Sequence, residues 1–89
     1  MNDERRRRAK NVATELVKLL GQIETMAVLT LALEGEERAA YENLPENLQE
    51  GDQGTDINNN ATKLNNAYQR LSEASARMVL AYHALGDLK

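Results

Sequence analysis

A run of basic residues near the start of the chain is its most conspicuous group of chemically active side chains. Arg5–Arg8 and Lys10 stand where cations oppose the dipole of a helix. Asp3 and Glu4 each precede one of these arginines by four residues, so local ion pairs can offset part of that charge. The alternative is an anion, because the planar guanidinium of arginine binds phosphate in a bidentate manner. The run therefore predicts either a solvated or intersubunit ion-pair surface, or a site for a phosphate-bearing ligand or an acidic partner.

A second polar group surrounds the single proline. The segment Tyr41–Gln49 reads Tyr-Glu-Asn-Leu-Pro-Glu-Asn-Leu-Gln and mixes amides, carboxylates and a phenol. It resembles a segment found between two charged helices in a family of small helical proteins of unassigned activity, from phages and mobile elements of Gram-positive bacteria. The resemblance covers about 45–60 residues, from the end of the first expected helix into the second, and implies a source and an architecture. A purely structural alternative is a helix–turn–helix plug in which Asn43 and Asn47 serve as caps.

An antiparallel oligomer would bring the arginines of one chain against this polar segment of another. A junction of that kind would combine cations, an aromatic ring and amides. The ligand-binding residues predicted on this basis are Arg5, Arg8, Tyr41, Asn43, Asn47 and Gln49.

The remaining polar residues predict no catalytic or metal site. His83 has no second histidine or carboxylate at metal-ligand spacing, and 52–63 departs from a calcium loop, with Ile57 where glycine is required. The asparagines of 58–66 suit an exposed helix face poorly, because asparagine is a weak helix former. They indicate sequence drift at solvated positions, or hydrogen bonds to a ligand or a partner backbone. Because no nucleophile stands beside a base, we expect a non-enzymatic protein without cofactor or metal.

Apolar spacing predicts the elements that position these groups. We expect helices over about 3–43 and 56–85, with a connection over about 44–55 that Pro45 initiates. Gly35 predicts a weak point in the first helix, and Asp52–Thr55 reads as a turn. The fold class is all-α: a single domain formed by a long antiparallel helical hairpin, assembling into a homo-oligomeric helical bundle.

Each helix carries a complete seam of apolar residues at spacings of four and three. The expected seams are Val12, Leu16, Leu19, Ile23, Met26, Thr30 and Leu33 in the first helix, and Ile57, Ala61, Leu64, Tyr68, Leu71, Ser75, Met78, Tyr82 and Leu85 in the second. Further apolar stripes exceed what one hairpin can cover, which favours a homo-oligomer, most simply two hairpins forming an antiparallel four-helix bundle. A monomer is the alternative. The predicted oligomer-interface residues are Val17, Leu20, Ala27, Leu31, Ala67, Ala74 and Ala81.

Composition narrows the class of protein. The 89 residues contain no cysteine and three tyrosines as the only aromatic residues, with a net charge of −3. No apolar run approaches the roughly 18–20 residues of a membrane span, and no apolar stretch typical of a signal peptide follows the basic start. We expect a cytoplasmic protein without membrane contact. The overall acidity and the absence of an aromatic platform beside the arginines make nucleic acid an unfavourable partner.

Three functions remain open. The first is a phage or mobile-element accessory protein that sequesters a host factor, such as a host protein or the phosphate-bearing nucleotide of an immune signal. The second is an assembly adaptor that binds a partner protein through a helix face. The third is a weak nucleic-acid-binding accessory that uses the arginine run.

Overall fold

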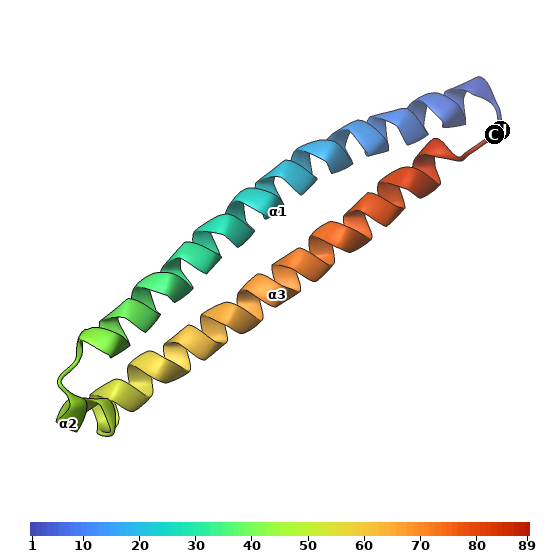
Figure 1. Ribbon diagram of the computed structural model, residues 1–89. Coiled ribbons are helices and arrows are strands. Elements are labelled where there is room, and N and C mark those ends of the chain that lie inside the picture. The colour runs from blue at the N-terminus through green and yellow to red at the C-terminus, as the bar shows by residue number, and fades with distance from the viewer.

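The computed structural model describes residues 1–89 and contains three helices and no strand. Helix α1 spans Asp3–Asn43, α2 spans Glu46–Gln49 and α3 spans Asp52–Gly86. α1 and α3 run side by side in opposite directions, and the two termini meet at one end of the hairpin (Figure 1). The Cα atoms extend over 68 × 14 × 13 Å, so the molecule is a rod two helices wide. The predicted all-α helical hairpin is confirmed.

Local chemistry fixes both ends of α1. The Asn2 side chain accepts a hydrogen bond from the Arg5 backbone N–H at 2.8 Å, as expected of an N-cap. At the other end Leu44 adopts an extended conformation with φ −68° and ψ 142°, because the ring of Pro45 disfavours α geometry in the residue before it. Between these ends α1 is continuous through Gly35, where the sequence predicted a weak point.

The connection is shorter than the sequence predicted. α3 begins at Asp52, and Asp52–Thr55 forms its first turn instead of a separate loop turn. Gly54, in the first turn of α3, lies buried against the connection, and this close contact accounts for the earlier start of α3. A Cβ atom built on Gly54 would lie 2.1 Å from the Gln49 carbonyl oxygen. The glycine therefore serves close approach of α3 to α2 and not the φ > 0 geometry of a turn.

α3 faces α1 through the predicted seam. Ala61 is almost fully buried, and most of the other seam residues are half-buried. α1 is rotated from the prediction, so that Leu16, Ile23 and Thr30 keep their inward position while the other half of the expected seam faces outward. The inward row of α1 comprises Ala9, Ala13, Leu16, Leu20, Ile23, Ala27, Thr30, Glu34, Glu37 and Tyr41. This row repeats at spacings of four and three, and its alanines allow the two helices to approach closely.

The hairpin buries few side chains. Only four of the 89 residues are buried: Ala27, Glu34, Gly54 and Ala61. Glu34 is a charged member of the inward row, and its carboxylate accepts a hydrogen bond from the Nε of Arg38 one turn later. Large apolar side chains of α1 remain exposed along most of its length. The single hairpin thus leaves much of its apolar surface in water.

By length and composition, α1 also qualifies as a candidate membrane span. The core helix of a soluble protein and a signal sequence share that composition, so one such helix near an N-terminus is weak evidence of a membrane segment. The expected cytoplasmic location stays a prediction.

Candidate functional site

The residues predicted to bind a ligand lie at opposite ends of the rod. Arg5 and Arg8 are exposed on the first turns of α1. The other four, Tyr41, Asn43, Asn47 and Gln49, lie at or after the end of α1, most of the rod's 68 Å length away. One hairpin does not bring the two groups together, and the antiparallel junction that would do so stays a prediction.

Gln49 has a structural role that spacing did not reveal. Its side-chain amide donates hydrogen bonds to the Tyr41 carbonyl oxygen at 3.1 Å and to the Leu44 carbonyl oxygen at 3.2 Å. These carbonyls belong to the end of α1, where helices leave acceptors unpaired. Asn43 and Asn47 are exposed and form no side-chain hydrogen bond within the chain. Gln49 thus serves the connection as a C-terminal cap of α1.

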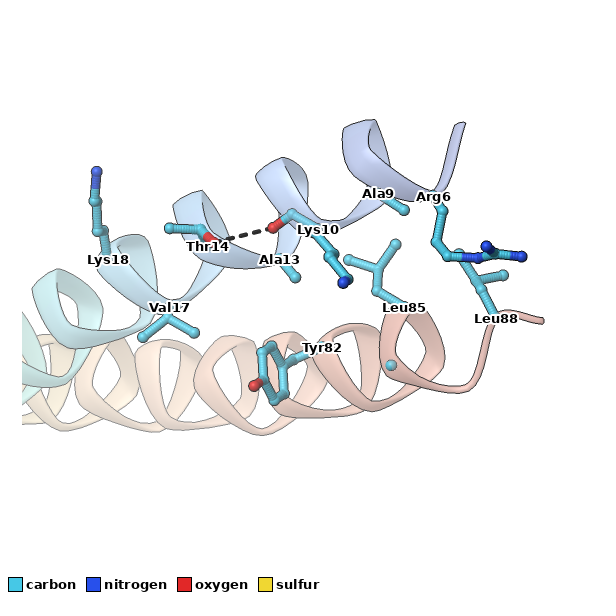
Figure 2. A pocket seen from close by; sticks show the side chains of 11 residues that line it. Arg6, Ala9, Lys10, Ala13, Thr14, Val17, Lys18, Tyr82, Leu85 and Leu88 are labelled. Atoms are coloured by element: carbon cyan, nitrogen blue, oxygen red, sulfur yellow. Dashed lines mark hydrogen bonds between the residues drawn. The ribbon is translucent and has the colours of Figure 1, made fainter. Parts of the chain in front are cut away.

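A groove at the other end of the rod, where the termini meet, combines cations with an apolar floor. It has a volume of about 730 Å³ and lies between the start of α1 and the end of α3 (Figure 2). We call it the terminal groove. Its lining residues are Arg6, Ala9, Lys10, Ala13, Thr14, Val17, Lys18, Tyr82, Leu85, Gly86 and Leu88.

The cations of the terminal groove differ in what they contact. Lys10 extends toward α3, whereas Lys18 points away from it (Figure 2). Lys18 also forms an ion pair with Glu15 at 3.1 Å, while Lys10 has no ion-pair partner in the hairpin. The Thr14 hydroxyl donates to the Lys10 carbonyl oxygen at 3.0 Å and is therefore already engaged. Lys10 is the free cation of the groove.

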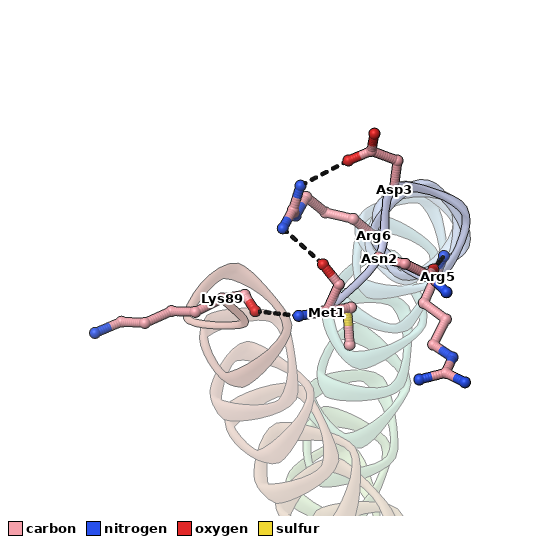
Figure 3. A network of polar contacts seen from close by, with 6 residues as sticks. All are labelled: Met1, Asn2, Asp3, Arg5, Arg6 and Lys89. Carbon is pink, nitrogen blue, oxygen red and sulfur yellow. Dashed lines mark hydrogen bonds and ion pairs between the residues drawn. The ribbon is translucent and has the colours of Figure 1, made fainter.

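Arg6 closes the groove at the chain termini. Its guanidinium contacts the Asp3 carboxylate at 2.9 Å and the Met1 carbonyl oxygen at 2.9 Å, while the Met1 amine donates to the Lys89 carbonyl oxygen at 2.9 Å (Figure 3). Asp3 therefore pairs with Arg6 at i,i+3, and the i,i+4 pairs expected for Asp3 and Glu4 are absent. The guanidinium is held in place at the rim by two acceptors.

The floor of the groove is apolar and contains one aromatic ring. Tyr82 of α3 lies across from Ala13 and Val17 of α1 (Figure 2). Its ring packs edge-on against that of His83, with centroids 5.9 Å apart. An aromatic face beside an ammonium can take a flat apolar group while the cation takes an anion. Sequence spacing could not reveal that Tyr82 and Lys10 line one groove, because they are 72 positions apart.

The predicted oligomer-interface residues divide between the inside and the outside of the hairpin. Leu20 and Ala27 belong to the inward row of α1, and Ala74 is half-buried on α3. Val17 lines the terminal groove. Leu31, Ala67 and Ala81 are exposed. Some of the residues predicted to form an oligomer interface are therefore already used in packing between the two helices of one hairpin.

No cluster of three or more His, Asp or Glu side chains has the geometry to hold a metal ion. Comparison with protein-family models, curated proteins and solved structures finds no match to this chain. The terminal groove and the exposed surfaces of the rod are therefore the features that bear on function.

Proposed function

We propose that the protein is a non-enzymatic binding protein that captures a small anionic ligand with a flat apolar part, such as a phosphate-bearing nucleotide, in the terminal groove. The single observation that supports this proposal is that unpaired Lys10 and the Tyr82 ring line the same groove, over an apolar floor. The two groups come from different helices, and the antiparallel pairing of α1 and α3 holds them together.

The charge around the groove suits an anion. Residues 1–18 carry six basic and three acidic side chains, a net charge of +3, whereas the whole chain carries −3. Arg6 at the rim offers a planar donor whose orientation Asp3 already fixes. Lys10 offers a mobile ammonium within reach of the same opening. A phosphate at the rim would meet both cations, with the base or another flat ring over Tyr82.

Sequestration is the role that suits such a site. The Thr14 hydroxyl of the groove donates to the helix backbone, and His83, the only histidine of the chain, does not line the groove. Binding without turnover removes a ligand from solution in proportion to protein concentration. The resemblance to phage and mobile-element proteins motivates a host signal nucleotide as the ligand.

A thermal-shift and calorimetric screen tests the proposal. The panel contains cyclic dinucleotides, cyclic trinucleotides, ADP-ribose derivatives and inorganic phosphate. A ligand present at 100 times its Kd adds about 2.7 kcal/mol to the stability of the hairpin. For a domain of this size that corresponds to a rise in Tm of more than about 10 °C. A panel in which no compound raises the Tm overturns the proposal.

Matched variants locate the binding site. Lys10→Gln and Tyr82→Leu are expected to weaken binding at least tenfold. Lys63→Gln removes a cation from a shallow groove lined by residues of the opposite half of the rod, and it is expected to leave binding unchanged. Equal losses for Lys10→Gln and Lys63→Gln would indicate a general charge effect instead of a site.

An assembly adaptor is the second candidate function. The observation that favours it is the run of exposed large apolar side chains along α1. A helical partner with a matching apolar face would cover them. Retention of such a partner by the wild-type protein, and its loss on Leu29→Glu, which leaves Val12, Leu19, Met26 and Leu33 unchanged, would support this function.

A further inference from the structure

An apolar stripe runs along one flank of α1 and has no partner in the hairpin. We call it the outer stripe, and its four members are between 50% and 56% exposed: Val12, Leu19, Met26 and Leu33. Each precedes an inward residue of α1 by one position and follows the previous member by seven. This spacing keeps all four side chains on one side of a helix that packs with heptad geometry.

The outer stripe lies opposite the terminal groove. Lys10 and Val17, which line the groove, each come one position after an inward residue of α1. Each member of the outer stripe comes one position before an inward residue, so the stripe and the groove lie on opposite flanks of the helix. Leu33 shares a shallow groove with Asn60 of α3, which also precedes an inward residue. The alanines at 67, 74 and 81 repeat the heptad position of Asn60. This face therefore presents large side chains on α1 beside small ones on α3.

The ends of α1 carry equal and opposite charge. Residues 3–10 contain five basic and two acidic side chains, a net charge of +3, while residues 34–43 contain four acidic and one basic side chain, a net charge of −3. Arg5 and Arg8 precede Val12 by seven and four residues, and Glu36 follows Leu33 by three, so these charged residues extend the outer stripe at its two ends. Glu36 and Leu33 line the same shallow groove, so they share this side of α1.

These features are symmetric about the midpoint between Gln22 and Ile23. Leu19 precedes Ile23 by four residues, and Met26 follows Gln22 by four. Val12 and Leu33 likewise stand eleven residues before Ile23 and after Gln22. The charged segments 3–10 and 34–43 are centred sixteen residues on either side of the same midpoint. An antiparallel two-fold partner would therefore place apolar on apolar along the stripe, and would bring the net-basic segment of each copy to the net-acidic segment of the other.

We propose that the outer stripe is the docking surface for a second copy of this chain, with the two α1 helices antiparallel and the two-fold axis beside Gln22. One broad face of the rod offers a projected area of roughly 950 Å², and a stable interface needs about 800 Å² per partner. The stripe with its flanking alanines and charged ends occupies such a face. The terminal groove, on the other flank, remains open in this dimer.

Engineered cysteines test the geometry, since the chain contains none of its own. Gln22→Cys is expected to form a disulfide between copies, because each cysteine lies beside its own symmetry mate. Val12→Cys is expected to form none with itself, because antiparallel copies of residue 12 are separated by about 30 Å along the helix. A mixture of Val12→Cys and Leu33→Cys proteins is expected to form the mixed disulfide. Cross-linking of Val12→Cys to itself would overturn the antiparallel arrangement.

Charge substitutions test the surface itself, with mass measured by light scattering and helicity by circular dichroism. Leu19→Glu is expected to raise the dimer dissociation constant at least tenfold without loss of helicity. Val28→Glu is the matched control, because Val28 is more exposed, on the same helix, and outside the stripe. A monomeric wild-type protein, or equal effects of both variants, would overturn the proposal.

Sedimentation of a monomeric wild type with neutral lipid vesicles would assign the stripe to a membrane surface instead. Since the groove plays no part here, nucleotide binding and dimer formation succeed or fail independently.

Discussion

Gly54 is the residue whose chemistry the fold constrains most tightly. A Cβ atom at this position would meet the backbone of Gln49 within 2.1–2.6 Å. Gly54→Ala is therefore expected to lower the free energy of unfolding by about 1–3 kcal/mol, despite the better helix propensity of alanine. Gly21→Ala is the matched control, because nothing lies within 4 Å of its Cβ position, and it is expected to stabilise the helix by roughly 0.5–1 kcal/mol. Urea unfolding of both variants measures the difference, and a stabilising Gly54→Ala would contradict the packing described.

Gln49 illustrates how one side chain can be assigned to structure or to ligand binding. Gln49→Ala removes two hydrogen bonds to carbonyls at the end of α1 and is expected to cost about 1 kcal/mol. Gln49→Glu is expected to cost more, because a carboxylate has no hydrogen to donate to the two carbonyl oxygens and is repelled by the negative end of the α1 dipole. Both losses should appear in thermal unfolding without ligand. If neither variant changes the Tm, the capping role is wrong.

At the scale of the helix, Glu34 is the one buried charged residue of the inward row of α1. Its carboxylate is buried between the helices and has Arg38 as its partner. Glu34→Leu is expected to raise stability, because replacing a buried ion pair by a packed apolar side chain is often favourable. Arg38→Ala is expected to lower stability by about 1 kcal/mol, since the carboxylate then stays buried without its cation. Chemical unfolding of the two single variants gives the signs, and a destabilising Glu34→Leu would indicate that the pair is needed for packing.

The ends of α1 followed from the sequence more closely than its rotation about its own axis did. Proline chemistry at Leu44–Pro45 and the cap at Asn2 set the ends of α1, and both follow from local geometry. The rotation of α1 about its axis could not be predicted from the sequence, because apolar residues cover a wider part of the helix circumference than one seam occupies. Val12 and Leu19 fit a seam as well as Ala13 and Leu20 do. Close approach of the backbones selects the row with alanines, and this preference depends on α3 as well as on α1.

At the scale of the whole molecule, contacts between residues far apart in the sequence determine which side chains line the terminal groove. The arginine run lies at the end of the rod that forms the terminal groove, yet the groove is lined by Arg6 and Lys10 and not by Arg5 and Arg8. Its aromatic ring comes from Tyr82, which only the antiparallel pairing of α1 and α3 brings to Lys10. The spacing of apolar residues along a segment indicates which side of a helix is buried. It does not indicate which residues of one helix lie beside which residues of the other.

The charge pattern of α1 leads to a prediction for the dimer as a whole. In the proposed arrangement Arg8 comes opposite residue 37 of the partner helix, beside the partner copy of Glu36. Arg8→Glu and Glu36→Arg each place like charges together at both ends of the interface, and each is expected to lower the Tm at fixed protein concentration. The double variant restores opposite charges and is expected to recover most of the loss.

The measurement is the dependence of Tm on protein concentration, because a dimer that unfolds to monomers becomes more stable as concentration rises. The wild-type protein and the double variant are expected to show this dependence, and both single variants should show it only at higher concentrations. The differences should shrink at 1 M salt, where the Debye length falls to about 3 Å. Additive losses in the double variant would show that Arg8 and Glu36 act separately, and would leave the antiparallel contact between the ends of α1 without support.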